Sequence, residues 1–299
     1  MTLKSAVERW RRARQFNAKP VAAQILERTP GIAKRSGTGR CCIFSHYDPQ
    51  GIIDPYVVYY LRKLRELDAD IIFVVTSDTL APEEIAKVAP LCRDIIRRVN
   101  ISIDFGSWNL GIHILGNELS NYRQLILAND SVYGPFHDLN PIFQDMGARG
   151  LDFWGLTESD EDGHHIQSYF RVFEQSAIDS AFFHNFWTGF RQEWRKRTLI
   201  AKYEVALSAQ ARANGMRFAS WISSRQVGSG ENLTLFFWDR LIADYKFPFL
   251  KTEILKLNRF ESPDAARWRE IVEAASDYDT ALIANHLRRV GSAVAPARG

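Results

Sequence analysis

Short apolar runs alternate with segments of helical periodicity between residues 41 and 130. Helices are predicted from Asp54 or Pro55 to Leu67, over 81–92 and over 106–119. The four apolar runs have the length and character of strands buried on both faces of a sheet. They are 41–47 (CCIFSHY), 70–77 (DIIFVVTS), 94–100 (DIIRRVN) and 124–130 (QLILAND). This alternation predicts an α/β fold with a mostly parallel central sheet flanked by helices.

The pattern changes after residue 150, where aromatic residues become frequent. Strands are predicted over 151–157 (LDFWGLT), 164–173 (HHIQSYFRVF) and 217–222 (RFASWI). Helical spacing is found over 178–190 and 198–214, and the remainder of the chain reads as a largely helical C-terminal part. We therefore divide one domain, residues 41–299, into halves 41–150 and 151–299.

The first forty residues form a basic arm. Residues 1–30 read as a helix that ends at Pro30-Gly31, and 31–40 (GIAKRSGTGR) read as a linker. The arm carries ten Lys and Arg against two Glu, a net charge of +8, whereas the whole chain has +3. Such an arm fits an anionic membrane surface, a nucleic acid, or simply a solvated helix. Because residues 41–299 are net negative, we expect no nucleic-acid partner.

Composition narrows the class of protein. The chain of 299 residues is 46% hydrophobic, enough for a sizeable core. No apolar run reaches the roughly 18 to 20 residues of a membrane span, and no apolar stretch of a secretory signal follows the basic N-terminus. Cys41 and Cys42 point to opposite faces of one strand, so a disulfide between them is not expected. With Cys92 the chain has three cysteines, an odd number that cannot all pair. Reduced thiols in a cytoplasmic protein are the simplest expectation.

Polar residues follow each of the four predicted strands of the first half. In an open parallel sheet, ligands bind outside the carboxyl ends of the strands, where the strand order reverses. We therefore expect these residues to meet at one edge. They are Ser45, His46, Tyr47 and Asp48; Thr76, Ser77 and Asp78; Arg98, Asn100, Asp104 and Gly106; and Asn129, Asp130 and Ser131.

Two of these strand ends allow a structural as well as a functional interpretation. The letters DFG at 104–106 lack the other motifs of a protein kinase, so no kinase is predicted. Gly106 at a helix start suits a phosphate, whereas Asp104 or Ser107 could equally be the N-cap of that helix. Asp130 fits a divalent cation that bridges phosphates, and it also fits an Asx-turn beginning at Asn129.

Several long motifs resemble the rhamnan synthesis protein F family between about residues 41 and 258. They are SHYDPQGIIDPYVVYYLRKL, RVNISIDFGSWNLGI, LILANDSVYGP, DFWGLTES, HIQSYFRVF and NLTLFFWDRLIADYKFPFLKTEIL. The resemblance implies a GT-A-like nucleotide-sugar-binding fold. It also implies a glycosyltransferase of cell-surface polysaccharide synthesis, of the rhamnan or O-antigen type. The expected reaction transfers a sugar such as rhamnose, from dTDP-rhamnose, to a glycan or lipid-linked glycan acceptor.

The resemblance also implies roles for individual residues. Residues 41–150 become the nucleotide-sugar-binding half and 151–299 the acceptor half. Asp130 takes the place of the metal-binding DxD pattern, whose first acid this chain lacks, so a need for Mg²⁺ or Mn²⁺ is left open. The donor would contact His46, Arg98, Asn100, Asp104, Gly106, Ser107, Trp108 and Asn129.

An inverting transfer further requires a base that deprotonates the acceptor hydroxyl. Glu204 is the first candidate, although it also reads as an acid on a helix face, and Asp152 and His165 are the alternatives. We expect a cytoplasmic protein, with the basic arm as the place of any peripheral contact with the inner membrane. A non-catalytic partner of a polysaccharide assembly complex, with the incomplete metal motif as its sign, is the alternative function.

Overall fold

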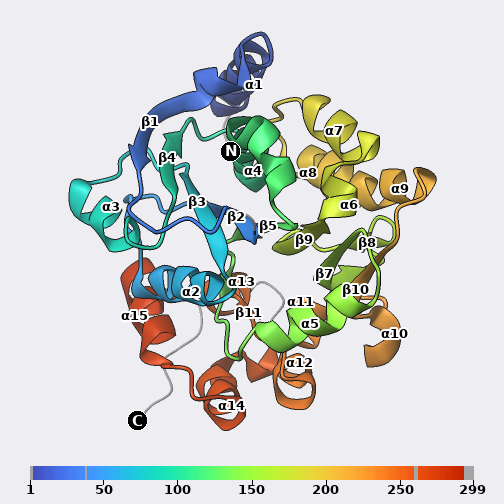
Figure 1. Ribbon diagram of the computed structural model, residues 1–299. Helices are drawn as coiled ribbons and strands as arrows, with labels where there is room; N and C mark the ends of the chain where they lie inside the picture. Colours follow the sequence, from blue (N-terminus) through green and yellow to red (C-terminus); the bar gives the residue numbers. More distant parts are fainter. Residues whose placement is uncertain (1–2, 38, 259–261, 293–299) are drawn as a thin grey trace.

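A computed structural model describes residues 3–37, 39–258 and 262–292 and has a nine-stranded sheet at its centre (Figure 1). The strand order is β1-β4-β3-β2-β5-β9-β7-β10, with β8 paired to β7. The strands of this sheet are β1 (Ile25–Pro30), β2 (Arg40–His46), β3 (Ala69–Val75), β4 (Asp94–Arg98), β5 (Gln124–Asn129), β7 (Phe153–Ser159), β8 (His165–Ile166), β9 (Phe170–Glu174) and β10 (Phe218–Ile222).

The strands run mostly in one direction. β4, β3, β2 and β5 are mutually parallel; β9 is antiparallel to both β5 and β7, so β7 and its parallel neighbour β10 run the same way as β5. The predicted mostly parallel α/β sheet is therefore confirmed. The sheet continues across residue 150 without interruption, because β5 of the first half pairs with β9 of the second.

Alternating side chains of the central strands fill two cores, one on each face of the sheet. Cys42 and Phe44 of β2 belong to one core, and Cys41 and Ile43 belong to the other. The two neighbouring cysteines thus point to opposite faces, as predicted, and all three cysteines are buried thiols. Because the central strands β2, β3 and β5 are buried on both faces, both faces of the sheet must be covered by helices.

Different helices cover the two faces. The first core receives side chains from α2 (Pro55–Glu66), α3 (Pro82–Val88), α5 (Asn140–Ala148), α10 (Ser224–Val227), α11 (Leu233–Phe236), α12 (Trp238–Tyr245), α13 (Thr252–Leu257), η4 (Pro263–Arg267), α14 (Trp268–Ala275) and α15 (Ala281–Val290). The second receives them from α4 (Ile103–Leu115), η2 (Gly116–Asn121), α6 (Gln175–Ile178), α7 (Ala181–Thr188), α8 (Lys196–Leu199), η3 (Ile200–Val205) and α9 (Ala206–Ala213). The predicted helical C-terminal part is thus present.

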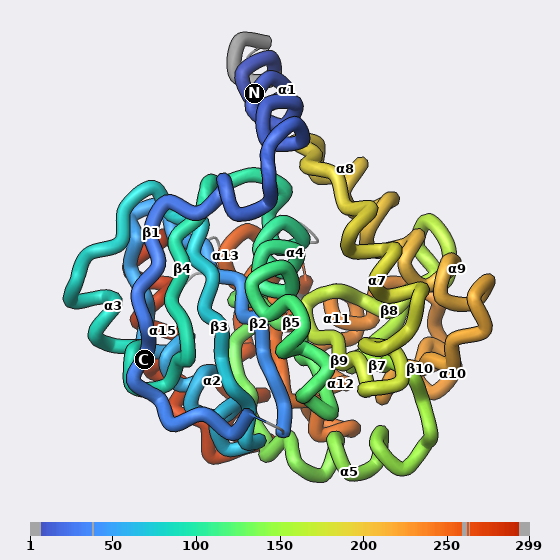
Figure 2. The backbone as a smooth tube through the Cα atoms, turned by 45° about the horizontal axis from the view of Figure 1, so that its top comes forward, coloured from blue at the N-terminus to red at the C-terminus, as the bar shows by residue number. Residues whose placement is uncertain are grey.

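The basic arm differs from its prediction. Its helix, α1 (Leu3–Asn17), is shorter than residues 1–30, and it is followed by the 3₁₀ turn η1 (Val21–Gln24) and by β1. β1 pairs antiparallel with the edge of β4. Its side chains are mostly exposed and it has no apolar alternation, so the pattern that identifies the buried strands is missing here. In the tube view of Figure 2, α1 projects from the body beside α8.

A second, small sheet joins the two halves of the chain. β6 (Val132–Tyr133), which begins two positions after Asp130, pairs antiparallel with β11 (Leu250–Lys251). The pairing brings residues more than a hundred positions apart next to the end of β5. Among the described residues, no helix combines the length and hydrophobicity that crossing a membrane would require.

Candidate functional site

A large cavity lies outside the carboxyl ends of the parallel strands. Its volume is about 1370 Å³. The residues after β2, β3, β4 and β5 all contribute to its lining, so the predicted convergence of the four strand ends is observed. These residues are His46, Tyr47 and Asp48; Thr76 and Asp78; Asn100 to Asp104; and Asp130 and Ser131.

The cavity coincides with a reversal in strand order. From β2 the chain proceeds outward to β3 and β4, and then returns to place β5 on the other side of β2. The loops after β2 and β5 therefore diverge and leave a crevice between them, which is where α/β sheets of this kind bind ligands. His46 ends β2 and Asp130 follows β5, so both flank this crevice.

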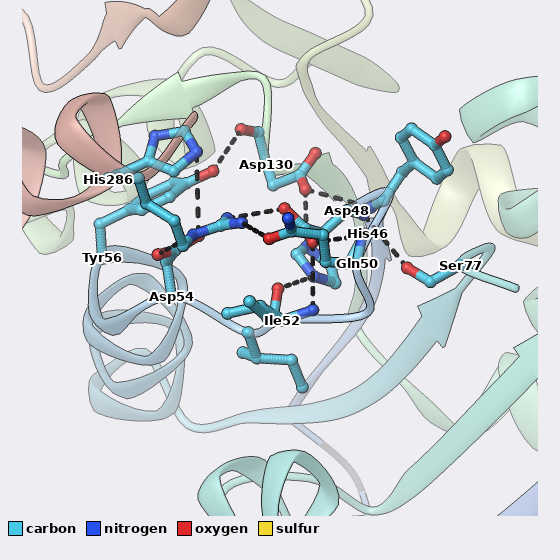
Figure 3. Close-up of polar contacts among 12 residues, drawn as sticks. His46, Asp48, Gln50, Ile52, Asp54, Tyr56, Ser77, Asp130 and His286 are labelled. Carbon is cyan, nitrogen blue, oxygen red and sulfur yellow. Dashed lines mark hydrogen bonds and ion pairs between the residues drawn. The ribbon is translucent and has the colours of Figure 1, made fainter. Parts of the chain in front are cut away.

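His46 and Asp130 form an ion pair at the crevice (Figure 3). His46 Nδ1 lies 2.6 Å from Asp130 Oδ2, and His46 Nε2 lies 3.2 Å from the Ile52 carbonyl oxygen. Both ring nitrogens face acceptors, an arrangement that favours the doubly protonated ring. Burial by itself would lower the pKa of His46, but the attraction and hydrogen bond of Asp130 outweigh it and raise that pKa. The same Asp130 oxygen also accepts the Tyr47 N–H at 3.1 Å.

Asp104 is the second carboxylate of the crevice. It is partly buried and accepts a hydrogen bond of 3.0 Å from Asn129 Nδ2. Burial, followed by repulsion from Asp130, raises the pKa of Asp104 to about 6, although hydrogen bonds from Ser45 and Asn129 act in the opposite direction. Asp104 and Asp130 thus line one cavity. Asn129 does not line it and is connected to it by its hydrogen bond to Asp104. Asn129 Oδ1 also accepts from the Ser131 N–H and hydroxyl, which makes the Asx-turn that was the alternative interpretation.

A salt-bridge cluster that the sequence did not indicate lies beside the cavity, with its two carboxylates in the lining. Arg289 of α15 donates to Asp48 at 2.6 Å and to both oxygens of Asp54. His286, one turn earlier, accepts or donates a 2.8 Å hydrogen bond with the Tyr133 hydroxyl and lines the cavity near Tyr56 (Figure 3). Arg289 and Asp54 are 235 positions apart, so no local pattern could have paired them.

The helix after β4 begins earlier than predicted. α4 starts at Ile103, so the DFG letters lie within its first turns. Its N-cap position is Ser102, and neither Asp104 nor Ser107 fills it. Ser102 and Ile103 both have positive φ, at 59° and 40°, a region that is costly for a β-branched residue such as Ile103. This turn directs Asp104 into the cavity.

Four of the residues predicted to contact a donor are buried beneath the cavity instead. The Arg98 guanidinium donates to Gln24 Oε1 at 2.8 Å and to the Ile101 carbonyl at 2.7 Å, and burial lowers its pKa to about 9. A Cβ on Gly106 would come within 2.5 Å of Arg98 Nη2, so the glycine makes room for the arginine. The remaining two are equally enclosed: Ser107 accepts from Arg98 at 3.2 Å, and Trp108 donates to the Ala128 carbonyl at 3.1 Å. These four support the site, and none lines it.

Glu204 does not line the cavity itself; it lies in a short π-helical turn, η3, an irregularity often found at functional sites. Its Oε1 accepts the Ser168 N–H at 2.8 Å. Leu199, one turn earlier, lines the cavity.

Lys251 is a candidate that sequence reasoning missed. Its ammonium lies 4.2 Å from the centre of the Tyr169 ring, and its strand, β11, is anchored next to Asp130 by β6. Burial lowers the pKa of Lys251 to about 8, against the attraction of Glu204, Glu253 and Asp104. Lys251 therefore lies in the field of both candidate acids, Asp104 and Glu204. A lone lysine in a helix-forming segment gave no signal of this.

Asp152 and His165 do not line the cavity. Asp152 precedes β7, at the opposite end of that strand from the cavity, and accepts hydrogen bonds of 2.7 Å from Ser176 Oγ and from the Arg217 N–H. These hydrogen bonds outweigh burial and lower the pKa of Asp152. His165 is buried, with Nδ1 2.7 Å from the Gly163 carbonyl. Both side chains therefore hold backbone segments in place, which is a structural role that the sequence prediction did not foresee.

Comparison with known proteins assigns the chain to a family. A family model described as rhamnan synthesis protein F matches residues 71–296, more than two thirds of the chain. The chain belongs to the rhamnan synthesis protein F family. The predicted resemblance is confirmed by this match.

Relatives of this family member are distant. The protein y4gN of Sinorhizobium fredii (strain NBRC 101917 / NGR234), named as uncharacterized, is 24% identical over 60% of this chain and 48% of its own length. Virulence protein VirA of Vibrio anguillarum (strain ATCC 68554 / 775) is 25% identical over 75% of this chain and 83% of its own length. The chain thus spans about half of the first relative and most of the second.

Two solved structures are similar at a low level. A candidate nucleotide-diphospho-sugar transferase from Desulfovibrio desulfuricans G20 has a TM-score of 0.43 and 11% identity, over 79% of this chain and 97% of that one. The glycosyltransferase GlyE in Streptococcus pneumoniae TIGR4 has a TM-score of 0.39 and 12% identity, over 88% of this chain and 66% of that one.

The acidic side chains of this family member offer little to a resident metal ion. Within the described ranges, no three His, Cys, Asp or Glu residues gather as a metal site. Asp130 Oδ2 is taken by His46 and Tyr47, which leaves its other oxygen to face the cavity. Mg²⁺ is commonly held by one or two carboxylates together with substrate phosphates. The residues therefore fit a cation that arrives with a phosphorylated ligand better than one bound by the protein alone.

Proposed function

We propose that this protein is a glycosyltransferase of cell-surface polysaccharide synthesis, which moves a sugar from a nucleotide-sugar donor to a glycan acceptor. The observation that carries the proposal is the cavity at the strand-order reversal, with Asp104 and Asp130 on its wall. The order β4-β3-β2-β5-β9-β7, with β9 reversed, also supports the GT-A-like fold expected from the sequence. Membership of a family described by rhamnan synthesis favours rhamnose, from dTDP-rhamnose, as the transferred sugar.

The donor would lie across the ends of β2 and β5. Asp104 and Asn100 line the part of the cavity next to β4, where carboxylate and amide groups can bond ribose and base. Asp130 would hold Mg²⁺ or Mn²⁺ through the donor diphosphate, and the cation would neutralise charge on that leaving group. His46 fixes Asp130 in this position. Residues 41–150 would thus form the donor half.

The acceptor would approach from the half formed by residues 151–299. Its hydroxyl oxygen attacks the anomeric carbon, the bond from that carbon to the diphosphate oxygen breaks, and the hydroxyl proton passes to a base. We assign the base to Glu204, whose carboxylate lies near Lys251. Lys251 would then add positive charge beside the departing diphosphate.

Transfer from dTDP-rhamnose to a rhamnose-terminated lipid-linked acceptor tests the proposal, with and without EDTA. We expect turnover by the wild-type protein and a loss of about a hundredfold or more in Asp130→Asn. Asp277→Asn, an exposed acid outside the cavity, is the matched control and should retain full turnover. UDP- and GDP-sugars supplied in parallel identify a different donor. If no nucleotide-sugar binds in a calorimetric titration, the protein is instead a non-catalytic partner of an assembly complex.

A further inference from the structure

Six Lys and Arg side chains line the cavity, and five of them come from α1 and the start of α8, where the lining also includes the acid Glu193. Two of these five come from α1, one directly precedes α8, and two are the first residues of α8. We call this set the basic rim. It consists of Arg9, Arg12, Arg195, Lys196 and Arg197. All five are exposed, and among the described residues none of them forms an ion pair. An unpaired cluster of one sign beside a cavity attracts ligands of the opposite charge.

The two parts of the basic rim are joined to each other. The Asn17 side chain at the end of α1 donates to the Gln192 carbonyl at 3.0 Å and accepts the Gln192 N–H at 2.6 Å. Phe16 and Trp194 pack against the small apolar cluster of Ala13, Val99 and Ile101. Because these contacts hold α1 beside the segment before α8, cations from both elements line the same cavity.

Exposed apolar side chains accompany these cations on α1. Trp10 is 44% exposed and Val7 is 39% exposed, three positions apart on the helix. The Arg14 guanidinium lies 5.0 Å from the Trp10 ring, and Arg195 lies 4.8 Å from the ring of Trp194. Tryptophan and arginine together on a helix of this kind suit the boundary between lipid headgroups and acyl chains.

We propose that α1 and the basic rim dock onto the surface of an anionic lipid bilayer, with the mouth of the cavity facing that surface. Use of this contact to receive a lipid-linked acceptor rests on the proposed function, whereas the contact itself does not. A lipid surface offers many phosphates over a wide area, which matches five cations spread over two elements. Trp10 and Val7 would find an apolar environment there, which a free nucleotide-sugar cannot give.

Cosedimentation of the full chain with vesicles tests this contact. The vesicles are phosphatidylcholine with and without phosphatidylglycerol, at low and high salt. The test variant is Arg9→Glu/Arg12→Glu. The matched control is Arg62→Glu/Arg123→Glu, which makes the same charge change at exposed residues away from α1. We expect salt-sensitive binding of the wild type and the control to anionic vesicles only, and a loss of about tenfold or more in the test variant.

Two further measurements distinguish lipid phosphates from a soluble diphosphate as the ligand of the basic rim. They also distinguish failure of the lipid contact from failure of the proposed glycosyltransferase function. Trp10→Ala should weaken vesicle binding although every cation remains, and soluble diphosphate should not displace the vesicles. Displacement by diphosphate, equal binding by Arg9→Glu/Arg12→Glu, or binding to duplex DNA in place of vesicles would overturn the inference. Asp104→Asn should bind vesicles like the wild type. Vesicle binding by a protein that transfers no sugar would refute the proposed function alone. Sugar transfer to a water-soluble acceptor by a protein that binds no vesicles would refute the lipid contact alone.

Discussion

Replacing Asp104 by Asn should stabilise the fold at neutral pH and not at acidic pH. The pKa of Asp104 rises from its ordinary 3.8 to about 6, first because of burial and then because of Asp130. One pKa unit corresponds to about 1.4 kcal/mol, so the charged carboxylate costs the folded state at most about 3 kcal/mol at neutral pH. Because Asp104 lines a solvent-accessible cavity, we expect a measured value of about 1 to 2 kcal/mol.

The direction of this pH dependence follows from where the Asp104 carboxyl binds its proton more tightly. A carboxyl group whose pKa is raised by folding binds its proton more tightly in the folded than in the unfolded protein. The destabilising effect of Asp104 is therefore absent below about pH 4, grows between about pH 4 and pH 6, and is complete above pH 6. Asparagine is neutral throughout this range and can still accept the hydrogen bond from Asn129.

Urea denaturation at about pH 4 and about pH 7.5 measures this difference. The eight tryptophans of the chain provide the fluorescence signal. The midpoint of Asp104→Asn should exceed that of the wild type only at the higher pH, and the control variant Asp277→Asn should show no such pH dependence. An equal gain at both pH values, or a gain only in acid, would contradict the assignment of an energetically strained Asp104. Under the proposed function, the stabilised variant should also lose turnover.

Two other substitutions test the packing around the site, and a third tests the proposed role of Lys251. Gly106→Ala should lower the free energy of unfolding by about 1 to 3 kcal/mol, because its Cβ would meet Arg98 at 2.5 Å; thermal denaturation measures this. Arg289→Met should cost about 3 kcal/mol by leaving two buried carboxylates unpaired, and denaturation at rising salt should leave most of that loss intact. Lys251→Met should reduce sugar transfer far more than it reduces stability, and Lys251→Arg should restore part of it; equal losses of both in Lys251→Met would make the lysine merely structural.

The sequence predicted the elements that carry strong periodicity and missed those that do not. β2, β3 and β5 are apolar on both faces, so their type and their parallel direction could be inferred from the alternation of apolar runs with helical segments, although their order in the sheet could not. β1 is exposed and pairs only at one edge, so its residues were absorbed into a helix prediction. A strand of that kind is specified by its partner, β4, and hardly by its own pattern.

The sequence predicted where in the fold the candidate site lies, but it predicted only some of the residues that line it. Polar residues at the ends of parallel strands must meet, and Asp104 and Asp130 do so. Whether a polar residue at a strand end points outward or inward depends on packing: Arg98 is fully enclosed, although Asn100, two positions later, lines the cavity. Lys251 and Arg289 come from segments far along the chain, and nothing local marks them.

The salt-bridge cluster at Arg289 also sets the order in which the site can be completed during synthesis. The loop between β2 and α2 leaves the ribosome more than two hundred residues before the arginine that neutralises its two aspartates. Until α15 emerges and docks, that loop must carry two negative charges without a counterion. A nascent chain can therefore build most of its sheet and still have no finished crevice, and a ligand that contacts these two aspartates would recognise only the completed polypeptide.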